Sequence, residues 1–186
     1  MQSTGHRAQE ESGSGPDAPP VLVIMGVSGS GKTTLAGLLA ERLGWDRQEG
    51  DELHPPANVA KMASGQPLTD DDRWPWLDLV AGWIDDHRAQ GRPGIITCSA
   101  LKHEYRDRLA RPGVVFVHLV GARATIAERL DHRVGHYMPP SLLDSQFNTL
   151  EPLGEDEAGI VVDAGQTPEA EVALVLKRLG LESTPR

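Results

Sequence analysis

The strongest chemical signal in the sequence lies between residues 26 and 33, which read Gly-Val-Ser-Gly-Ser-Gly-Lys-Thr. This segment matches the pattern G-x-x-x-x-G-K-T, and it stands between an apolar run and a helical pattern, the context in which the motif is specific. Its glycines allow the positive φ angles and close approach by which successive backbone N–H groups surround a phosphate. We therefore predict a nucleotide-binding loop made of Gly26, Val27, Ser28, Gly29, Ser30, Gly31, Lys32, Thr33 and Thr34.

Two side chains at the end of this loop indicate the ligands. Lys32 is placed to reach the β and γ oxygens of ATP, and the Thr33 hydroxyl is placed to bind Mg²⁺. The apolar strand ending in Asp that commonly helps to hold magnesium is missing, because the run at residues 95–98 is followed by Ser99. We expect Thr33, water and the nucleotide to hold the metal, with help from a carboxylate elsewhere. Ser28 and Ser30 are interpreted as small loop residues with incidental hydroxyls.

Four classes of nucleotide-binding protein can be weighed against the sequence around such a loop. A GTPase switch needs an Asn-Lys-x-Asp motif to read the guanine base, and the chain contains none. The missing Asp-terminated strand argues against a motor or transporter ATPase. A kinase of small molecules is favoured, since such enzymes manage with this arrangement, and a nucleotide-gated binding module without turnover stays open.

The elements that must position the loop follow from hydrophobic periodicity. Apolar runs predict strands at residues 21–25, 94–98, 114–120 and 160–163, with a weaker strand leading into residues 49–51. Helical patterns lie between them, at residues 32–43, 56–63, 103–110 and 124–133, with longer helices ending near residues 90 and 179. Strands that alternate with helices predict an α/β fold, a doubly wound five-stranded parallel sheet with right-handed crossovers.

Local signals place the helix ends and one buried face. Thr69 with Asp72, and Ser141 with Asp144, have capping-box spacing, and Thr167 precedes the Pro-Glu that opens the closing helix. The helix from Thr69 repeats apolar residues that we predict to form one core-facing stripe, namely Trp76, Leu79, Val80, Trp83 and Ile84.

Length and composition limit the remaining possibilities. The 186 residues suit one domain, predicted at residues 21–180, between a disordered polar tail at residues 1–20 and a short tail at residues 181–186. A net charge of -9 argues against a nucleic-acid or membrane partner. The single Cys98 permits no internal disulfide, and no apolar run is long enough to span a bilayer, so we expect a cytoplasmic protein.

The motifs beyond the loop resemble the gluconokinase family in order and spacing across residues 21–179. The matching blocks are GVSGSGK at 26–32, EGDELHP at 49–55, Asn58, KMASG at 61–65, PLTDDDR at 67–73, CSALK at 98–102, YRD at 105–107, RVGHYM at 133–138, QF at 146–147 and LEP at 150–152. One position differs from the family pattern, since Glu49 stands where Asp often precedes Gly-Asp, which leaves the magnesium role of position 49 open.

The resemblance implies an ATP-dependent kinase that phosphorylates D-gluconate to 6-phospho-D-gluconate, with a mobile lid and often a homodimeric assembly. The implied fold is similar to that of shikimate and adenylate kinases. Shikimate is therefore the alternative acceptor. Gluconate and ATP are the expected small-molecule partners.

Three residues are candidates for contact with the acceptor. Asp51, at a strand end that faces the loop, is assigned the acceptor hydroxyl and its proton, although it also suits a turn beside Gly50. His54 either contacts the sugar acid or caps the following turn. The Arg73 guanidinium suits the planar carboxylate of gluconate through two parallel hydrogen bonds, and its alternative is a surface ion pair with a neighbouring Asp.

Four further basic residues are assigned to the same cleft. Lys102 and Arg106 follow a strand end and are secondary candidates for the substrate carboxylate. Arg129 and Arg133 share a helix face, and the resemblance implies that Arg129 lies near the adenine and phosphates while Arg133 reaches the transferred phosphoryl group. Their alternative is an exposed pair that balances Glu128 and Asp131. Gly135, Pro139 and Pro140 suit lid hinges, and residues 164–167 suit backbone packing against adenine.

Overall fold

The computed structural model describes residues 18–133 and 140–181. Most of the two predicted tails, and the predicted hinge residues Gly135 and Pro139, lie outside the described residues. The division of the chain into two tails and one domain therefore stays a prediction.

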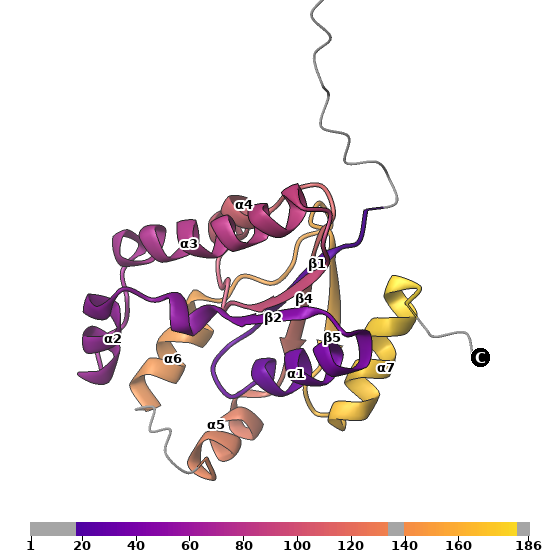
Figure 1. The fold of residues 1–186 in the computed structure, drawn as a ribbon. Helices are drawn as coiled ribbons and strands as arrows, with labels where there is room; N and C mark the ends of the chain where they lie inside the picture. Colours follow the sequence, from indigo (N-terminus) through magenta and orange to yellow (C-terminus); the bar gives the residue numbers. More distant parts are fainter. Residues whose placement is uncertain (1–17, 134–139, 182–186) are drawn as a thin grey trace, which may run out of the picture.

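A five-stranded sheet forms the centre of the molecule (Figure 1). Its strands are β1 (Val21–Met25), β2 (Asp46–Glu49), β3 (Gly94–Thr97), β4 (Val114–Val120) and β5 (Gly159–Asp163). They lie in the order β2-β3-β1-β4-β5, and every neighbouring pair is parallel. The predicted five-stranded parallel sheet is confirmed. All carboxyl ends therefore meet at one edge, where a parallel sheet commonly binds its ligands.

The central strand β1 is buried on both faces, which explains its continuous apolar run. Val21, Val23 and Met25 pack on one side with α3 (Asp70–Ala89) and α4 (His103–Leu109), while Leu22 and Ile24 pack on the other. The second side is covered by α1 (Lys32–Leu43) and α7 (Pro168–Leu179). Helices on both faces confirm the doubly wound arrangement, and they hold the residue after Met25 in a fixed place.

The remaining short elements gather beyond the carboxyl ends of the strands (Figure 1). They are the 3₁₀ turn η1 (Gly50–Leu53), α2 (Pro56–Ala63), α5 (Arg123–Asp131) and α6 (Pro140–Thr149). The sheet and the four helices that cover its faces thus form the scaffold, and these other elements surround the edge at which ligands bind.

The helix-end signals have different outcomes. At α3 the Thr69 hydroxyl accepts from Asp72 N–H while the Asp72 carboxylate accepts from Thr69 N–H, so the capping box is confirmed. Thr167 caps α7 by accepting from Ala170 N–H. The Ser141 prediction is wrong, because α6 already includes Pro140. Proline has the φ angle of a first helical residue and no N–H to satisfy, so it suits that position better.

The predicted apolar stripe of α3 is wrong at one residue. Trp76, Val80 and Ile84 are buried, but Leu79 is 51% exposed. The buried face also takes in Leu77, which lies on the opposite side of the stripe from Leu79. Trp83 is half-buried against the core. Within the two described ranges, no helix combines the length and apolar character needed to cross a membrane.

Candidate active site

The loop between β1 and α1 has the backbone that its glycines predict. Gly26, Gly29 and Gly31 have φ angles of 145°, 79° and 101°, a region that L side chains rarely adopt. A Cβ at Gly29 would lie 2.7 Å from Leu130 Cγ, so the loop is also closely packed. The N-terminus of α1 has no side-chain cap and no acidic residue in its first turn. Its positive end is therefore left for an anion.

A cavity of about 910 Å³ opens in front of this loop. Its size is in the usual range of ligand sites, about 300 to 1,000 Å³. Besides the loop, its lining includes Asp51, His54, Arg73, Arg129 and Arg133, which come from separate segments of the chain. The structure thus brings most of the predicted site residues to one cavity.

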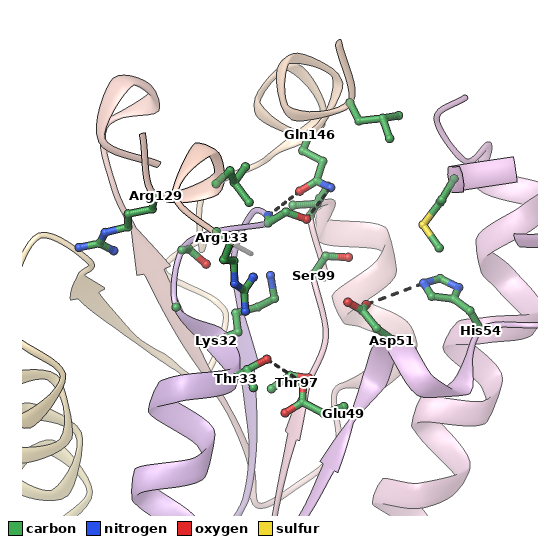
Figure 2. Close-up of a pocket in the computed structure, with 18 of the residues that line it drawn as sticks. Lys32, Thr33, Glu49, Asp51, His54, Thr97, Ser99, Arg129, Arg133 and Gln146 are labelled. Carbon is green, nitrogen blue, oxygen red and sulfur yellow. Dashed lines mark hydrogen bonds and ion pairs between the residues drawn. The ribbon is translucent and has the colours of Figure 1, made fainter. Parts of the chain in front are cut away.

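Lys32 is half-buried and lies in the middle of the view of this cavity (Figure 2). Its ammonium donates to the carbonyl oxygens of Gly26 at 2.9 Å and Val27 at 3.0 Å. Burial lowers its pKa, and the Asp51 carboxylate is the largest influence in the opposite direction. Among the described residues no carboxylate lies within 4.0 Å of its nitrogen. The ammonium is therefore held by neutral groups and stays available to an anionic ligand.

Thr33 lies beside a carboxylate that the sequence left without a role. The Glu49 Oε2 atom accepts from Thr33 Oγ1 at 3.0 Å and from Thr97 Oγ1 at 2.8 Å. The other oxygen, Oε1, is buried without a hydrogen-bond partner in the described part of the chain, and its ion-pair neighbour is Arg47 Nη1 at 3.6 Å. Hydroxyl and carboxylate oxygens are the protein ligands that Mg²⁺ prefers. The donor set therefore fits a magnesium ion near the phosphate loop, with Glu49 as the carboxylate that would complete it.

The turn η1 positions Asp51 on the wall facing Lys32. Gly50 N–H donates to Thr97 Oγ1 at 3.1 Å, and Gly50 carbonyl accepts from Trp76 Nε1 at 2.8 Å. A Cβ at Gly50 would lie 2.0 Å from the Thr97 carbonyl oxygen, so only glycine fits. The Asp51 side chain is 79% exposed and points into the cavity (Figure 2). A rigid turn thus presents a solvated carboxylate.

His54 is held against the same wall. Its ring stacks on Trp76 with centroids 4.1 Å apart, and its Nε2 lies 3.9 Å from Asp51 Oδ1. The ring nitrogen Nδ1 is 3.3 Å from Asn58 Nδ2. Burial lowers the pKa of His54, which favours the neutral imidazole. A neutral, stacked ring can exchange hydrogen bonds with a polyhydroxyl ligand.

Arg73 lies at the start of α3 and lines the cavity. One guanidinium nitrogen donates to the Tyr105 hydroxyl at 2.9 Å, and Tyr105 in turn donates to Asp70. The alternative of a surface ion pair with a neighbouring Asp is not observed, because no carboxylate of the described ranges lies within 4.0 Å of the guanidinium. Its other donors are available to a ligand.

Lys102 and Arg106 lie outside the cavity lining, in contrast to the prediction. The Lys102 ammonium pairs with Asp70 Oδ1 at 3.0 Å. Arg106 is fully buried, with Nε 2.6 Å from Glu157 Oε1 and Nη1 donating to Ala100 carbonyl at 2.8 Å. A residue that follows a strand end lies near the cleft. The packing of α4 nevertheless points the Arg106 side chain toward the loop that contains Glu157.

Arg129 lies within α5, but Arg133 lies beyond the last residue of that helix, Asp131, so the predicted shared helix face is not formed. Arg129 donates from Nη2 to the Ala164 carbonyl at 2.5 Å, which fixes its side chain at the end of β5. Arg133 is exposed and lies beside Lys32, whose pKa it lowers (Figure 2). Neither arginine has Glu128 or Asp131 as an ion-pair partner within 4.0 Å in the described structure. Both line the cavity.

Three cavity residues escaped the sequence reasoning. Gln146 of α6 exchanges hydrogen bonds with Ser28, although only its place in the QF block singled it out. Glu171 of α7 is 4% exposed, and burial raises its pKa to about 7. Ser99, at the end of β3, also lines the cavity. A Gln or Glu within a helix gives no local signal of a ligand site, so only the packing reveals them.

The cysteine of the chain lies directly behind this site. Cys98 is 1% exposed and follows β3. Burial raises the pKa of its thiol to about 12, and this thiol is therefore protonated at neutral pH. Cys98 is a packing residue of the core.

The fold and the loop together define a P-loop kinase. Residues 21–153 match the family described as an AAA domain. A gluconokinase of Gluconobacter oxydans is 49% identical over 166 residues, which cover 88% of this chain and 93% of that relative. This chain belongs to the gluconokinase family.

Solved structures give the same result. A sugar kinase from Janibacter, in an unliganded crystal structure, is 49% identical with a TM-score of 0.83, over 88% of this chain and 96% of that chain. A gluconokinase from Sinorhizobium meliloti is 42% identical with a TM-score of 0.77, over 89% of this chain and 98% of that chain. A shikimate kinase from Aquifex aeolicus has a TM-score of 0.52 at 16% identity, a likeness of fold alone.

Proposed function

We propose that this kinase transfers the γ-phosphoryl group of ATP to D-gluconate and forms 6-phospho-D-gluconate. One observation carries the proposal together with the family membership. The half-buried Lys32, with no carboxylate within 4.0 Å among the described residues, and the exposed Asp51 line the same cavity, and Arg73 lines it as well. A phosphate donor site and an anionic acceptor site thus share one space.

On the donor side, the backbone of residues 26–33 and the start of α1 bind the phosphates. Lys32 balances their charge, and the carbonyl oxygens that now hold it are weak competitors for the ammonium. Thr33 and Glu49 are the residues that would hold Mg²⁺, which when bound neutralises charge on the phosphates. Arg129, held at Ala164, forms the wall at the adenine end together with Glu171.

On the acceptor side, Asp51 orients the acceptor hydroxyl and accepts its proton. His54 contacts other hydroxyls of gluconate. Arg73 binds the gluconate carboxylate through the guanidinium N–H groups that do not donate to Tyr105. Lys102 and Arg106 support this wall by their pairs with Asp70 and Glu157 and do not touch the acceptor.

Phosphoryl transfer depends mainly on positioning and charge neutralisation, because its transition state is loose and its charge lies on the equatorial oxygens. Arg133, beside Lys32, is assigned to this developing charge. A dry cavity is needed to prevent transfer to water. We infer that the enzyme acts as a homodimer in the cytoplasm, and light scattering and cell fractionation test those two points.

The direct test is coupled ATP consumption with a panel of acceptors. We expect strong turnover with D-gluconate and little with shikimate, adenylyl sulfate or nucleoside monophosphates. Turnover with shikimate and none with gluconate would sink the proposal. The variant Asp51→Asn sharpens it, since its kcat should fall by about 10² while ATP affinity is retained. A collapse of ATP affinity instead would assign Asp51 to the metal.

A further inference from the structure

Two hydrogen bonds join α6 to the phosphate-binding loop. Ser28 N–H donates to Gln146 Oε1 at 2.7 Å, and Gln146 Nε2 donates to Ser28 Oγ at 3.1 Å. The two residues are 118 positions apart in the chain. Figure 2 shows the Gln146 amide lying over the loop, on the cavity side. Both residues line the cavity.

The chemistry of the two groups fixes the direction of both bonds. A backbone N–H only donates, so the amide oxygen of Gln146 must face it, and the amide NH₂ must then face the Ser28 hydroxyl. Because that hydroxyl oxygen accepts, its own proton has to point to a different acceptor. Ser28 lines the cavity, so a ligand oxygen in the cavity can accept this proton.

Contacts other than the two hydrogen bonds also hold the helix that carries Gln146. Leu142 and Leu143 of α6 are buried, and Leu142 shares a helix face with Gln146 one turn later. Asp144 of the same helix pairs with Arg123 of α5. Core packing of Leu143 and an ion pair to α5 therefore support the helix that presents the amide to the loop.

We propose that Gln146 is a positioning residue for phosphoryl transfer, which orients the Ser28 hydroxyl as a hydrogen-bond donor to the transferred phosphoryl group. The inference rests on the proposed function. Ser28 thereby becomes a catalytic donor, and the Ser28 N–H is kept by Gln146. A neutral donor preset toward developing negative charge stabilises the transition state without reorganisation at the moment of transfer.

Two substitutions separate this role from simple packing. Gln146→Met keeps the length of the side chain and removes both hydrogen bonds. Gln146→Glu still accepts from Ser28 N–H, but its carboxylate cannot donate to Ser28 Oγ and instead attracts the hydroxyl proton away from the cavity. We expect kcat to fall about tenfold in Gln146→Met and further in Gln146→Glu, with the KM values for ATP and gluconate within about threefold. Asn148→Ala, at an exposed position of the same helix, is the matched control and should keep normal kinetics.

A double-mutant cycle with Ser28→Ala is the decisive measurement. If Gln146 acts through Ser28, the double variant Ser28→Ala/Gln146→Met loses no more kcat than Ser28→Ala alone. Losses that multiply, or a Gln146→Met variant with normal kcat, would overturn the proposal. Thermal unfolding of each variant without ligands checks that the fold is retained. The gluconate-dependent rate of the unaltered enzyme tests the proposed function separately. If that rate is absent, the same cycle is read from the slow hydrolysis of ATP by water.

Discussion

The cation at the phosphate end of the cavity has no carboxylate partner in the described residues, whereas the cations in the wall formed by α3 and α4 are paired with carboxylates. At the phosphate end, the half-buried Lys32 donates to two neutral carbonyl oxygens and has no carboxylate within 4.0 Å in residues 18–133 and 140–181. At the wall, Lys102 pairs with Asp70 and Arg106 with Glu157. Burial of an uncompensated charge is costly. A chain that retains such a cation places it where an anionic substrate will arrive, whereas paired cations hold the scaffold.

Replacement of Lys32 gives the largest expected effect on catalysis. Lys32→Met removes a charge-assisted donor from the phosphates, so kcat should fall by about 10² to 10³. Lys102→Met removes a cation of the paired kind and should keep kcat within about fivefold. Steady-state kinetics with ATP and gluconate varied separately gives both numbers. Equal losses in the two variants would break the comparison.

Arg106 should matter to the free energy of unfolding. Arg106→Met leaves the Glu157 carboxylate, 7% exposed, without its partner, and such a loss costs about 3 kcal/mol or more. Arg108 of the same helix pairs with Asp78 at the surface, so Arg108→Met is the control and should change little. Urea unfolding of the three proteins is the measurement. A stable Arg106→Met variant with a raised KM for gluconate would instead indicate that Arg106 binds the substrate, as the sequence analysis predicted.

Arg73 and Arg133, neither of which has a carboxylate within 4.0 Å in the described residues, are expected to act at different stages of the reaction. Arg73 binds the ground-state carboxylate, so Arg73→Ala should raise the gluconate KM by roughly 10- to 100-fold, equivalent to about 1.5 to 3 kcal/mol. Arg133→Ala should mainly lower kcat, because the negative charge that Arg133 stabilises develops on the phosphoryl group only during transfer. Arg73→Lys should rescue poorly, since a point charge cannot form two parallel hydrogen bonds. An unchanged KM in Arg73→Ala, or a normal kcat in Arg133→Ala, removes the assigned role.

The smallest expected effect concerns a buried anion. Burial raises the pKa of Glu171 from 4.5 to about 7, against the nearby Arg129 guanidinium. The folded state therefore binds this proton more tightly than the unfolded state, and the associated stability is present below about pH 4.5 and lost as the pH rises through 7. Glu171→Gln should remove this loss, and should be more stable than the unaltered protein by about 1 to 2 kcal/mol at pH 8. Parallel pH profiles of unfolding would contradict the assignment.

The sequence predicted the parts of the site that are contiguous in the chain. The phosphate loop needs only glycines, a lysine and a strand and helix on either side, and all of these lie within residues 21–43. The sheet and most helices followed from periodicity in the same local way. Arg106 could not be placed, because its direction depends on Glu157, which is 51 residues away. Gln146 and Ser28 meet only after α6 has packed. The neighbours of Glu49 could not be predicted either, because they come together only where the ends of β1, β2 and β3 lie side by side.

The buried Cys98 has a practical consequence for spectroscopy. Because the chain has no other cysteine and this thiol is protonated and covered by the core, maleimide dyes should leave the folded protein unlabelled. One cysteine introduced at an exposed position, such as Asn148 on α6, then becomes the single attachment point for a fluorophore. Energy transfer between that fluorophore and a fluorescent nucleotide would report the distance from α6 to the phosphate loop through the catalytic cycle, without any need to remove a background thiol.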